Sequence, residues 1–372
     1  MREYLKNLDW WLIGSVMFLC TMSYLVLFGI DKVGGQTDFS GRQAFFIFLG
    51  LAAAVVASLF DSRAFRNYPS LIMILYFLAL VFLVAVLFLG QQVRGMAGWF
   101  KIGSFNFQPV ELTKLILILV LAKYFSGRHA EVYRARHIIV SLVYAILPIV
   151  LVLRQPDLGS ALILGAIWLG IVILSGIKLR HLTIVLLTGI LVAVLAWFFA
   201  FQPYQKERII SYLNPTADPQ GFSYNVIQSK IAIGSGGFFG KGLGRGTQGQ
   251  LGFLPEKQTD FIFALVAEEW GFLGIALMLG AFGLFFWRLI LAAVASTNNF
   301  SRLLIAGFAL MVFAQMAINV GMNLGLLPVT GISLPFLSSG GSNLLVNFVA
   351  LGIVQNIIAQ SKESVRLGEE EQ

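Results

Sequence analysis

The stretch "YPSLIMILYFLALVFLVAVLFLG" (residues 68–90) carries no charged side chain and is almost entirely apolar. A helix needs about 20 such residues to cross the ~30 Å hydrocarbon core of a bilayer. About ten stretches of this kind recur, although the fourth and fifth are short. They run approximately Trp10–Ile30, Ala44–Phe60, Tyr68–Gly90, Glu111–Phe125, Ile138–Leu153, Leu158–Ile177, Leu182–Phe201, Asp260–Trp287, Leu303–Leu327 and Leu344–Ile358. The sequence therefore predicts an all-α polytopic membrane protein, a bundle of about ten transmembrane helices.

The composition agrees with this class. Hydrophobic residues make up 58% of the 372 residues and charged residues only 12%, about half of the charged share of soluble domains. Transmembrane strands would show ~10-residue segments of alternating hydrophobicity, whereas these stretches are apolar on every side. We expect a single integral membrane domain over residues 1–372.

The distribution of Lys and Arg predicts the topology. The N-terminus, the C-terminus and the even-numbered loops between the expected helices carry more of these residues than the short odd-numbered loops. Cytoplasmic loops are enriched in Lys and Arg, so both termini are predicted to be cytoplasmic, with residues 359–372 as a short cytoplasmic tail. Much of the formal charge of +8 belongs to this bias. It therefore does not indicate a nucleic-acid partner.

Polar motifs gather on the predicted outer face. With this topology, the fourth, sixth, eighth and tenth helices begin there, so their unpaired amide groups and positive dipole ends face outward. At or near these starts lie "QPVELTK" (108–114), "RQPDLGS" (154–160), "PEKQTDF" (255–261) and "SLPFLSSGGSN" (333–343). We therefore expect the functional site on the outer side of the membrane.

The loop between the seventh and eighth helices, residues 202–259, is much longer than ordinary connections of about 4–6 residues and is expected to be extracytoplasmic. It mixes apolar residues with glycines, which argues against disorder, and "VIQSKIAI" (226–233) could form a short interfacial helix. The glycines of residues 234–246 do not fit a phosphate-binding loop, because Gly242 stands where Ser or Thr is required. Tight turns are favoured over a nucleotide site.

The outer face lacks imidazole and thiol groups. His129, His137 and His181 lie in or beside predicted cytoplasmic loops, and the single cysteine, Cys20, lies inside the first helix. This excludes Ser-His-Asp catalysis, Cys-His catalysis and the usual zinc ligand sets from an outer site. Carboxylate and cation chemistry remains. The outer acids nearest the membrane are Glu111, Asp157, Glu256 and Asp260, and the nearby cations are Arg94, Lys101, Lys114, Arg154 and Lys257.

Each of these acids also has a purely structural explanation. Asp157 and Asp260 could cap the helices that follow them, and Glu111 has the i,i+3 spacing of an ion pair with Lys114. Taken together, four helix starts and several cations on one rim indicate an anion site, because helix N-termini and Lys or Arg side chains both favour phosphate.

Glu268 and Glu269 lie about 12 Å deeper than Asp260 along the eighth helix. Ionisable residues at such depth are costly and are candidates for function. A buried polar contact with a neighbouring helix is slightly favoured as their role.

Four blocks resemble the SEDS family of bacterial cell-wall proteins (shape, elongation, division and sporulation), and the resemblance covers nearly the whole chain. They are "RGMAGWFKIGSFNFQPVELTKL" (94–115), "QPDLGSAL" (155–162), the stretch from Asn214 to Gly274, and "GLLPVTGISLPFLSSGGSNLL" (325–345). The spelling "GTQGQLGFLPE" (246–256) favours the rod-shape branch over the division branch.

The resemblance implies a peptidoglycan glycosyltransferase on the outer face of the bacterial cytoplasmic membrane. It would polymerise lipid II, the undecaprenyl-diphosphate-linked disaccharide peptide, into glycan strands for cell elongation and rod shape. A class B penicillin-binding protein would crosslink the growing strand. The family's essential acid corresponds to Asp260, its coupled Glu and Lys to Glu111 and Lys114, and a further important acid to Asp157.

Three positions depart from the family's commoner pattern. Val110, Gln258 and Ser339 stand where Ser, His and Tyr are more usual. None of the three removes a charged residue assigned to chemistry. Glu256 and Lys257 are expected to form the rim of the site.

Asp260 is expected to act as a general base in an inverting transfer, deprotonating the acceptor sugar's hydroxyl as it attacks the anomeric carbon of the donor. The diphosphate leaving group needs charge neutralisation. Arg94, Lys101 or Lys114 could supply it, as could a divalent cation such as Mg²⁺ or Mn²⁺, for which the sequence shows no ligand set. The lipid tails require a groove facing the membrane lipid, which the sequence does not place.

Two other functions stay open. Transport of lipid II across the membrane is kept open by Glu268 and Glu269, although transporter sites lie near the bilayer midplane and most polar residues here lie at the outer end. The chain could also be a scaffold that activates a partner penicillin-binding protein.

Overall fold

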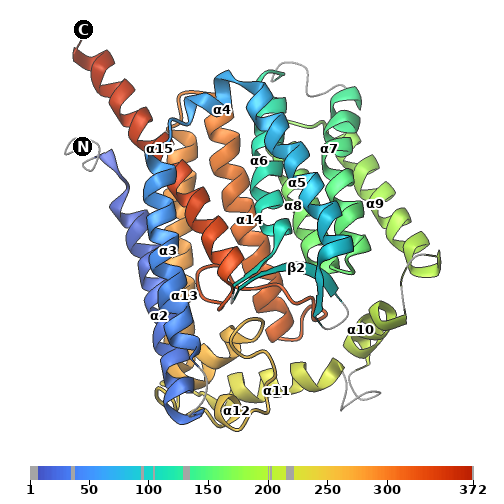
Figure 1. Cartoon of the computed structure of the whole chain (residues 1–372), viewed down its shortest axis with the longest axis vertical. Coiled ribbons are helices and arrows are strands. Elements are labelled where there is room, and N and C mark those ends of the chain that lie inside the picture. Colours follow the sequence, from blue (N-terminus) through green and yellow to red (C-terminus); the bar gives the residue numbers. More distant parts are fainter. Residues whose placement is uncertain are drawn as a thin grey trace.

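The computed structural model describes residues 7–34, 38–93, 96–103, 105–128, 135–199, 201, 203–214 and 222–370. Within these residues ten long helices form a bundle (Figure 1). They are α2 (Trp10–Gly34), α3 (Phe39–Leu59), α5 (Pro69–Leu89), α6 (Pro109–Ser126), α7 (Ala135–Arg154), α8 (Leu158–Leu174), α9 (Leu179–Phe199), α13 (Ile262–Val294), α14 (Asn299–Asn323) and α15 (Gly341–Glu370). The predicted helical membrane bundle is confirmed.

Eight of these helices are long and apolar enough to cross a membrane. The other two are α8, which has 17 residues, and α6, which carries Glu111, Lys114 and Lys123. The two departures have different causes, since α8 is short but fully apolar whereas α6 holds charge inside the bundle.

Short helices mark the two ends of the bundle (Figure 1). At one end α2 begins, α15 ends and the short helix α4 (Arg63–Asn67) lies; we call this the terminus end. At the other, the loop end, lie α10 (Pro203–Leu213), α11 (Phe222–Ser235) and α12 (Thr247–Gln250). The helix α11 contains the short helix expected at residues 226–233. That the terminus end is cytoplasmic stays a prediction.

A small antiparallel sheet joins α5 to α6 and has the strand order β1-β2-β3. Its strands are β1 (Gln91–Val93), β2 (Met96–Ile102) and β3 (Phe105–Phe107). The sequence analysis did not predict it, because strands of three to seven residues are too short to establish an alternating pattern. Ser342 at the start of α15 anchors the sheet's end, accepting from the amide of Gln108 (2.9 Å) and donating to the carbonyl of Asn106 (3.0 Å).

The helices α6 and α9 have opposite environments. Most of α6 is buried, and Leu117, Ile118 and Leu121 have no exposed surface. It lies in the middle of the bundle, whereas α9 lies at its edge (Figure 1). No residue of α9 is buried. A long apolar helix without protein around it is solvated by lipid, so α9 contacts lipid over most of its surface.

The helix α13 is interrupted at Gly271, whose backbone has φ 66° and ψ −160°. The glycine-rich loop of residues 236–244 docks on this break. The amides of Lys241 and Gly242 each donate to a carbonyl of α13, those of Glu268 and Glu269, at 3.0 Å. After the break, the amides of Phe272 and Leu273 donate to the loop carbonyls of Gly237 and Phe238 at 2.9 and 3.1 Å. The loop thus supplies the backbone partners that the break removes from the helix.

The side chains of Glu268 and Glu269 bind the same loop and the short helix α12 that follows it. The Glu268 carboxylate accepts from the Lys241 ammonium at 2.9 Å, from the Thr247 hydroxyl of α12 at 3.2 Å, and from the α12 amides of Gln248 and Gly249 at 3.0 and 3.2 Å. Glu269 accepts from the amide of Gly244 at 3.1 Å. A contact with a neighbouring helix was expected, and Glu268 makes it with the short helix α12, while Lys241 and Gly244 of the glycine-rich loop supply the other described partners.

We predict that Gly271→Ala destabilises the protein. A Cβ at this position would lie 2.3 Å from the amide nitrogen of Gly240, in a backbone conformation that L side chains rarely adopt. The expected loss is about 3 kcal/mol or more, measured by thermal unfolding in detergent. Gly280→Ala, in the same helix with no heavy atom within 4 Å of the added Cβ, is the control and should unfold at or above the wild-type temperature. Equal unfolding temperatures for the two variants would contradict the docking role.

Candidate active site

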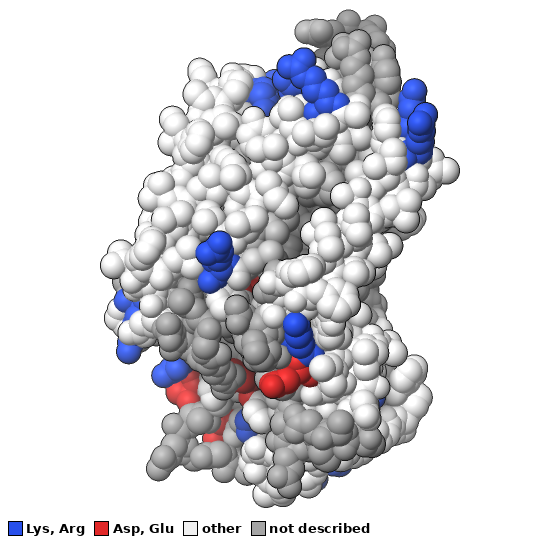
Figure 2. All heavy atoms as spheres, turned by 90° about the vertical axis from the view of Figure 1, so that its right-hand side faces the viewer, with Lys and Arg blue, Asp and Glu red and all other residues white. Residues whose placement is uncertain are grey.

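The polar motifs at four helix starts converge on one cavity. The N-terminal turns of α6, α8 and α15 and the residues before α13 line a space of about 390 Å³. The wall is completed by α3, by strands β2 and β3, and by the segment 330–333. Figure 2 shows acidic side chains of one face gathered in its lower part, toward the loop end, with Lys and Arg beside them.

Five of the predicted site residues line this cavity: Glu111, Lys114, Asp157, Glu256 and Asp260. They come from three separate parts of the chain, between residues 111 and 260. The cavity therefore combines four carboxyl groups with a lysine, the carboxylate and cation chemistry that the sequence predicts for the outer face.

Two predicted residues, Lys101 and Lys257, lie outside the cavity lining. Lys101 is exposed on β2 and is not part of the cavity lining. The ammonium group of Lys257 donates to the carbonyl of Gly249 in the preceding loop, and burial lowers the pKa of Lys257. Arg94 lies outside the described residues. Lys257 therefore stabilises the loop fold instead of lining the cavity.

Glu111 and Lys114 form a buried ion pair with 2.7 Å between Oε1 and Nζ, which confirms the pairing expected from their spacing. The exposed fraction of Lys114 is 0% and that of Glu111 is 6%. The second carboxylate oxygen of Glu111 accepts from Asn343 Nδ2 at 2.8 Å, and Asn347 in turn donates to Asn343. Buried charges require such compensation, so this pair ties α6 to the first turns of α15.

Asp157 is the N-cap of α8, as the capping explanation predicts. Its Oδ1 accepts from the amide of Ser160 at 2.9 Å, and its Oδ2 accepts from Gln108 Nε2 at 3.4 Å. Burial raises the pKa of Asp157 above its usual range, against the lowering effect of the Ser160 amide. The residue thus links the starts of α6 and α8 while lining the cavity.

Asp260 does not cap α13, so that explanation of its position is wrong. The helix begins at Ile262, and its N-cap, Phe261, makes no side-chain cap hydrogen bond. The main chain of Asp260 is fixed from α14, where Asn319 and Asn323 donate to its carbonyl at 2.9 and 3.0 Å. Its carboxylate lines the cavity opposite Gly331. Backbone anchoring thus leaves the side chain directed at the space where a substrate would lie.

Glu256 is also held in a defined position. Its φ of 50° lies in the left-handed region, which is sparsely populated by residues other than glycine and is found where the surroundings enforce it. The hydroxyl of Thr259 donates to Glu256 Oε2 at 3.0 Å, and the amides of Thr259 and Asp260 donate to its carbonyl at 3.1 Å. This turn, from Glu256 to Asp260, determines the direction of the backbone at Asp260.

Two cavity residues were missed by the sequence analysis. Arg42 of α3 lines the cavity although it is more than sixty positions from the nearest polar motif, and nothing in its sequence context marks it. Gln315 lies in the middle of the apolar helix α14 with 0% exposure, and within the described residues neither of its amide atoms has a hydrogen-bond partner. A polar residue inside an apolar helix is a signal that could have found Gln315.

An apolar cavity of about 510 Å³ lies next to the polar one. Its lining is dominated by apolar side chains of α8 and α9, such as Leu162, Ile190, Val194 and Trp197, and Thr330 lines both cavities. The two cavities therefore share Thr330 in their walls.

Among the described residues, no group of three or more His, Cys, Asp or Glu side chains is placed to hold a metal ion. The carboxylates of Asp157 and Glu111 already accept protein hydrogen bonds from Ser160, Gln108 and Asn343. The protein side chains that could neutralise an anion in the cavity are Arg42 and Lys114.

Comparison with known proteins places this arrangement in a family. Residues 5–363 match the family described as "Cell cycle protein", FtsW/RodA/SpoVE. The peptidoglycan glycosyltransferase MrdB of Escherichia coli K12 is 36% identical over 357 residues, 96% of this chain and 95% of that protein.

Solved structures agree. A chain from the structure titled "Structural coordination of polymerization and crosslinking by a peptidoglycan synthase complex" superposes with a TM-score of 0.81 at 31% identity, over 95% of this chain and 98% of that one. The crystal structure of the Thermus thermophilus rod shape determining protein RodA gives a TM-score of 0.70 at 30% identity, over 94% of this chain and 96% of that one. The chain therefore belongs to the FtsW/RodA/SpoVE family, the SEDS proteins, as its motifs indicate.

Proposed function

We propose that this protein is a peptidoglycan glycosyltransferase that polymerises lipid II for cell elongation and rod shape, on the outer face of the bacterial cytoplasmic membrane. The observation that carries the proposal is a polar cavity beside an apolar cavity, with Thr330 in the walls of both. A lipid-linked sugar has the same two parts, a polar sugar diphosphate and an apolar chain. The relative named a peptidoglycan glycosyltransferase supports the reaction, and the rod shape determining neighbour supports the cellular role.

Asp260 acts as the general base in this proposal. Its carboxylate removes the proton from the acceptor sugar's hydroxyl as that oxygen attacks the anomeric carbon of the donor, and the lipid diphosphate departs with the bonding electrons. The hydrogen bonds from Asn319 and Asn323 fix the backbone of Asp260. A base held in this way needs little rearrangement before reaction.

The departing diphosphate needs positive charge nearby. Of the two cavity cations, Arg42 is the more available to supply it. The charge of Lys114 is largely compensated by Glu111 at 2.7 Å, whereas Arg42 is exposed at the cavity. The first turns of α6 and α8 line the cavity and add the partial positive charge of their helix dipoles. Lys101, exposed on β2, would contact outer parts of the substrate, and the same role is proposed for Arg94, which lies outside the described residues. A divalent cation remains an additional source of charge.

Asp157 and Glu256 are proposed to contact the sugar from opposite walls of the cavity. Both are oriented by protein hydrogen bonds, from Ser160 and Gln108 in the first case and from Thr259 in the second. Oriented carboxylates suit the recognition of sugar hydroxyl groups. A class B penicillin-binding protein is the proposed partner, because the structural neighbour comes from a complex that couples polymerisation with crosslinking.

The transport alternative loses its main support. Glu268 and Glu269, which kept it open, accept hydrogen bonds from the glycine-rich loop, and that loop also fills the break in α13. Broken helices at transporter sites expose their ends to substrate and ions, whereas this break is closed by protein. The scaffold alternative is separated from the proposal by whether the chain is active without its partner.

Asp260→Asn is predicted to insert and fold normally but to polymerise purified lipid II at least ~10²-fold more slowly, the usual contribution of a general base. Polymer formation would be followed by gel separation of labelled glycan, with and without chelator and without a partner protein. Asp61→Asn, an exposed acid beside α4, is the matched control and should keep wild-type activity. Wild-type polymerisation by Asp260→Asn would refute the assignment, and lipid II translocation in proteoliposomes without polymerisation would favour transport.

Arg42→Gln is predicted to lower kcat/KM for lipid II by about 10²-fold, because it removes the most available charge facing the leaving group. Lys32→Gln, which removes an equal charge from an exposed side chain outside the cavity, should change kcat/KM by no more than about twofold. Initial rates over a range of lipid II concentrations test both. An equal loss in the two variants would place the diphosphate outside this cavity.

Gln315→Leu should raise stability while weakening substrate binding. Replacing a buried amide that lacks partners by an apolar side chain of similar shape removes a desolvation cost of about 1–3 kcal/mol, and the KM for lipid II should rise. Gln355→Leu is the control, since Gln355 is also buried but exchanges two hydrogen bonds with the backbone of Asp9, at 2.9 and 3.1 Å. That variant should lose stability at unchanged KM. A destabilised Gln315→Leu with wild-type KM would show a purely structural role.

A further inference from the structure

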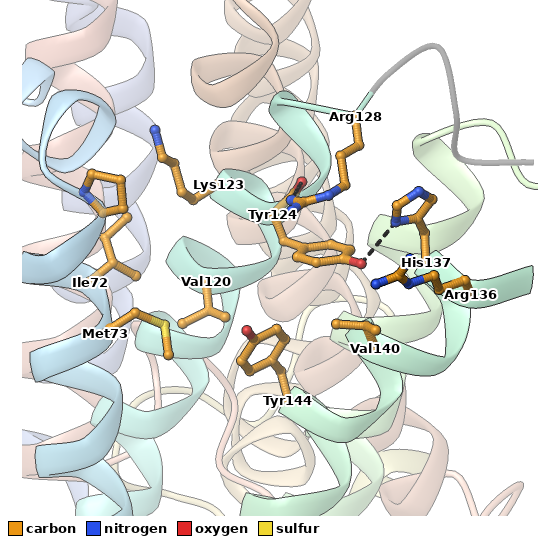
Figure 3. A pocket seen from close by; sticks show the side chains of 11 residues that line it. Ile72, Met73, Val120, Lys123, Tyr124, Arg128, Arg136, His137, Val140 and Tyr144 are labelled. Atoms are coloured by element: carbon orange, nitrogen blue, oxygen red, sulfur yellow. Dashed lines mark hydrogen bonds between the residues drawn. The ribbon is translucent and has the colours of Figure 1, made fainter. Parts of the chain in front are cut away.

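A further large cavity lies at the terminus end, away from the candidate active site (Figure 3). Its volume is about 610 Å³, and its walls are the ends of α5, α6 and α7. None of the residues assigned to glycosyl transfer lines it. Its volume falls in the usual range for small-molecule and lipid sites, about 300–1,000 Å³.

The lining of this cavity is divided between charge and apolar surface (Figure 3). Lys123 and Arg128 lie in its upper part, Arg136 lies lower, at about the height of Val120, and Val140 lies just below Arg136. The described lining includes no acidic residue. A ligand that fits would carry negative charge at one end and an apolar chain at the other.

The charged rim is held in place by aromatic contacts. The Arg128 guanidinium lies 4.3 Å from the centre of the Tyr124 ring, and Arg128 Nη1 donates to the Tyr124 carbonyl at 3.1 Å. The Tyr124 hydroxyl is 3.0 Å from His137 Nδ1 (Figure 3). Lys123 donates to the carbonyl of Arg66, which joins the rim to α4. A site organised before binding loses less entropy when a ligand arrives.

The cavity adjoins surface that faces lipid. On α7, Ile139 and Val143 are 61% and 48% exposed, and on α5, Ile74 and Phe77 are 63% and 59% exposed. Large apolar side chains exposed on transmembrane helices contact acyl chains. A ligand with an acyl chain can therefore reach the cavity from within the bilayer while its charged group stays at the surface.

We propose that this cavity binds an anionic phospholipid. Its phosphate would lie between Lys123, Arg128 and Arg136, and its acyl chain would pack against Val120 and Val140. Basic groups between transmembrane helices attract anionic headgroups, and with the predicted topology the lipid comes from the cytoplasmic leaflet. The proposal goes beyond glycosyl transfer, since it concerns the opposite end of the molecule and uses none of the active-site residues.

The test is lipid-dependent thermal unfolding of the delipidated full-length chain in detergent. The probes are 1-palmitoyl-2-oleoyl phosphatidylglycerol, the phosphatidylcholine with the same chains, and glycerol 3-phosphate as a soluble headgroup. Phosphatidylglycerol should raise the unfolding temperature saturably, and neither other probe should do so at equal concentration. Lys123→Gln, Arg128→Gln and Arg136→Gln should each raise the half-saturating concentration on the order of fivefold. Native mass spectrometry should show fewer retained phosphatidylglycerol molecules on the triple variant.

Two controls separate the site from general surface charge and from misfolding. Arg302→Gln with Lys362→Gln removes exposed charges at the same end and should leave the response unchanged. Val140→Trp fills the cavity without altering charge and should also weaken binding, whereas Ile139→Trp on the lipid-facing side should not. Equal stabilisation by phosphatidylcholine or by glycerol 3-phosphate would overturn the proposal. So would a full response in either the triple variant or Val140→Trp.

Discussion

The buried ion pair between Glu111 and Lys114 is the constraint around which the site is organised. Because α6 is enclosed by other helices, neither charge could remain there alone without a cost of several kcal/mol. Each partner therefore fixes the other, and the remaining carboxylate oxygen of Glu111 takes Asn343 from α15. Because these charges must be compensated, the start of α15 has to lie beside the start of α6. Both helix starts line the cavity.

A second constraint comes from the interruption of α13. The glycine-rich loop binds the break through backbone hydrogen bonds and accommodates Glu268 and Glu269. As a result, the residues just before α13 line the cavity, whereas the preceding helices α11 and α12 lie at the loop end (Figure 1). Asp260 lies between this loop and α14, whose two asparagines hold its backbone. The glycine-rich loop, which has no regular pattern in the sequence, thus helps to position Asp260.

Sequence patterns predicted features that depend on neighbouring residues, such as ion pairs, caps and helices. They did not predict features that depend on contacts between distant segments. The spacing of Glu111 and Lys114 predicted their pair, "QPDLGS" predicted the cap at Asp157, and hydropathy predicted the helices. Asp260 looked equally like a cap, because a cap is decided by backbone angles that the sequence does not display. Arg42 reaches the cavity only through the packing of α3, and Lys257 turns away from it toward Gly249. Side-chain direction in irregular segments depends on tertiary contacts, and no periodicity encodes it.

The helix α9 lacks any buried residue and yet lines the apolar cavity beside the polar one. The bilayer itself must therefore complete the boundary of that space wherever protein does not. A polyprenyl chain can move sideways into it by diffusion within the hydrocarbon, without passing through water. It thereby avoids exposing methylene groups, each of which would cost about 0.8 kcal/mol. The proposed tail-binding region is in this sense continuous with the membrane.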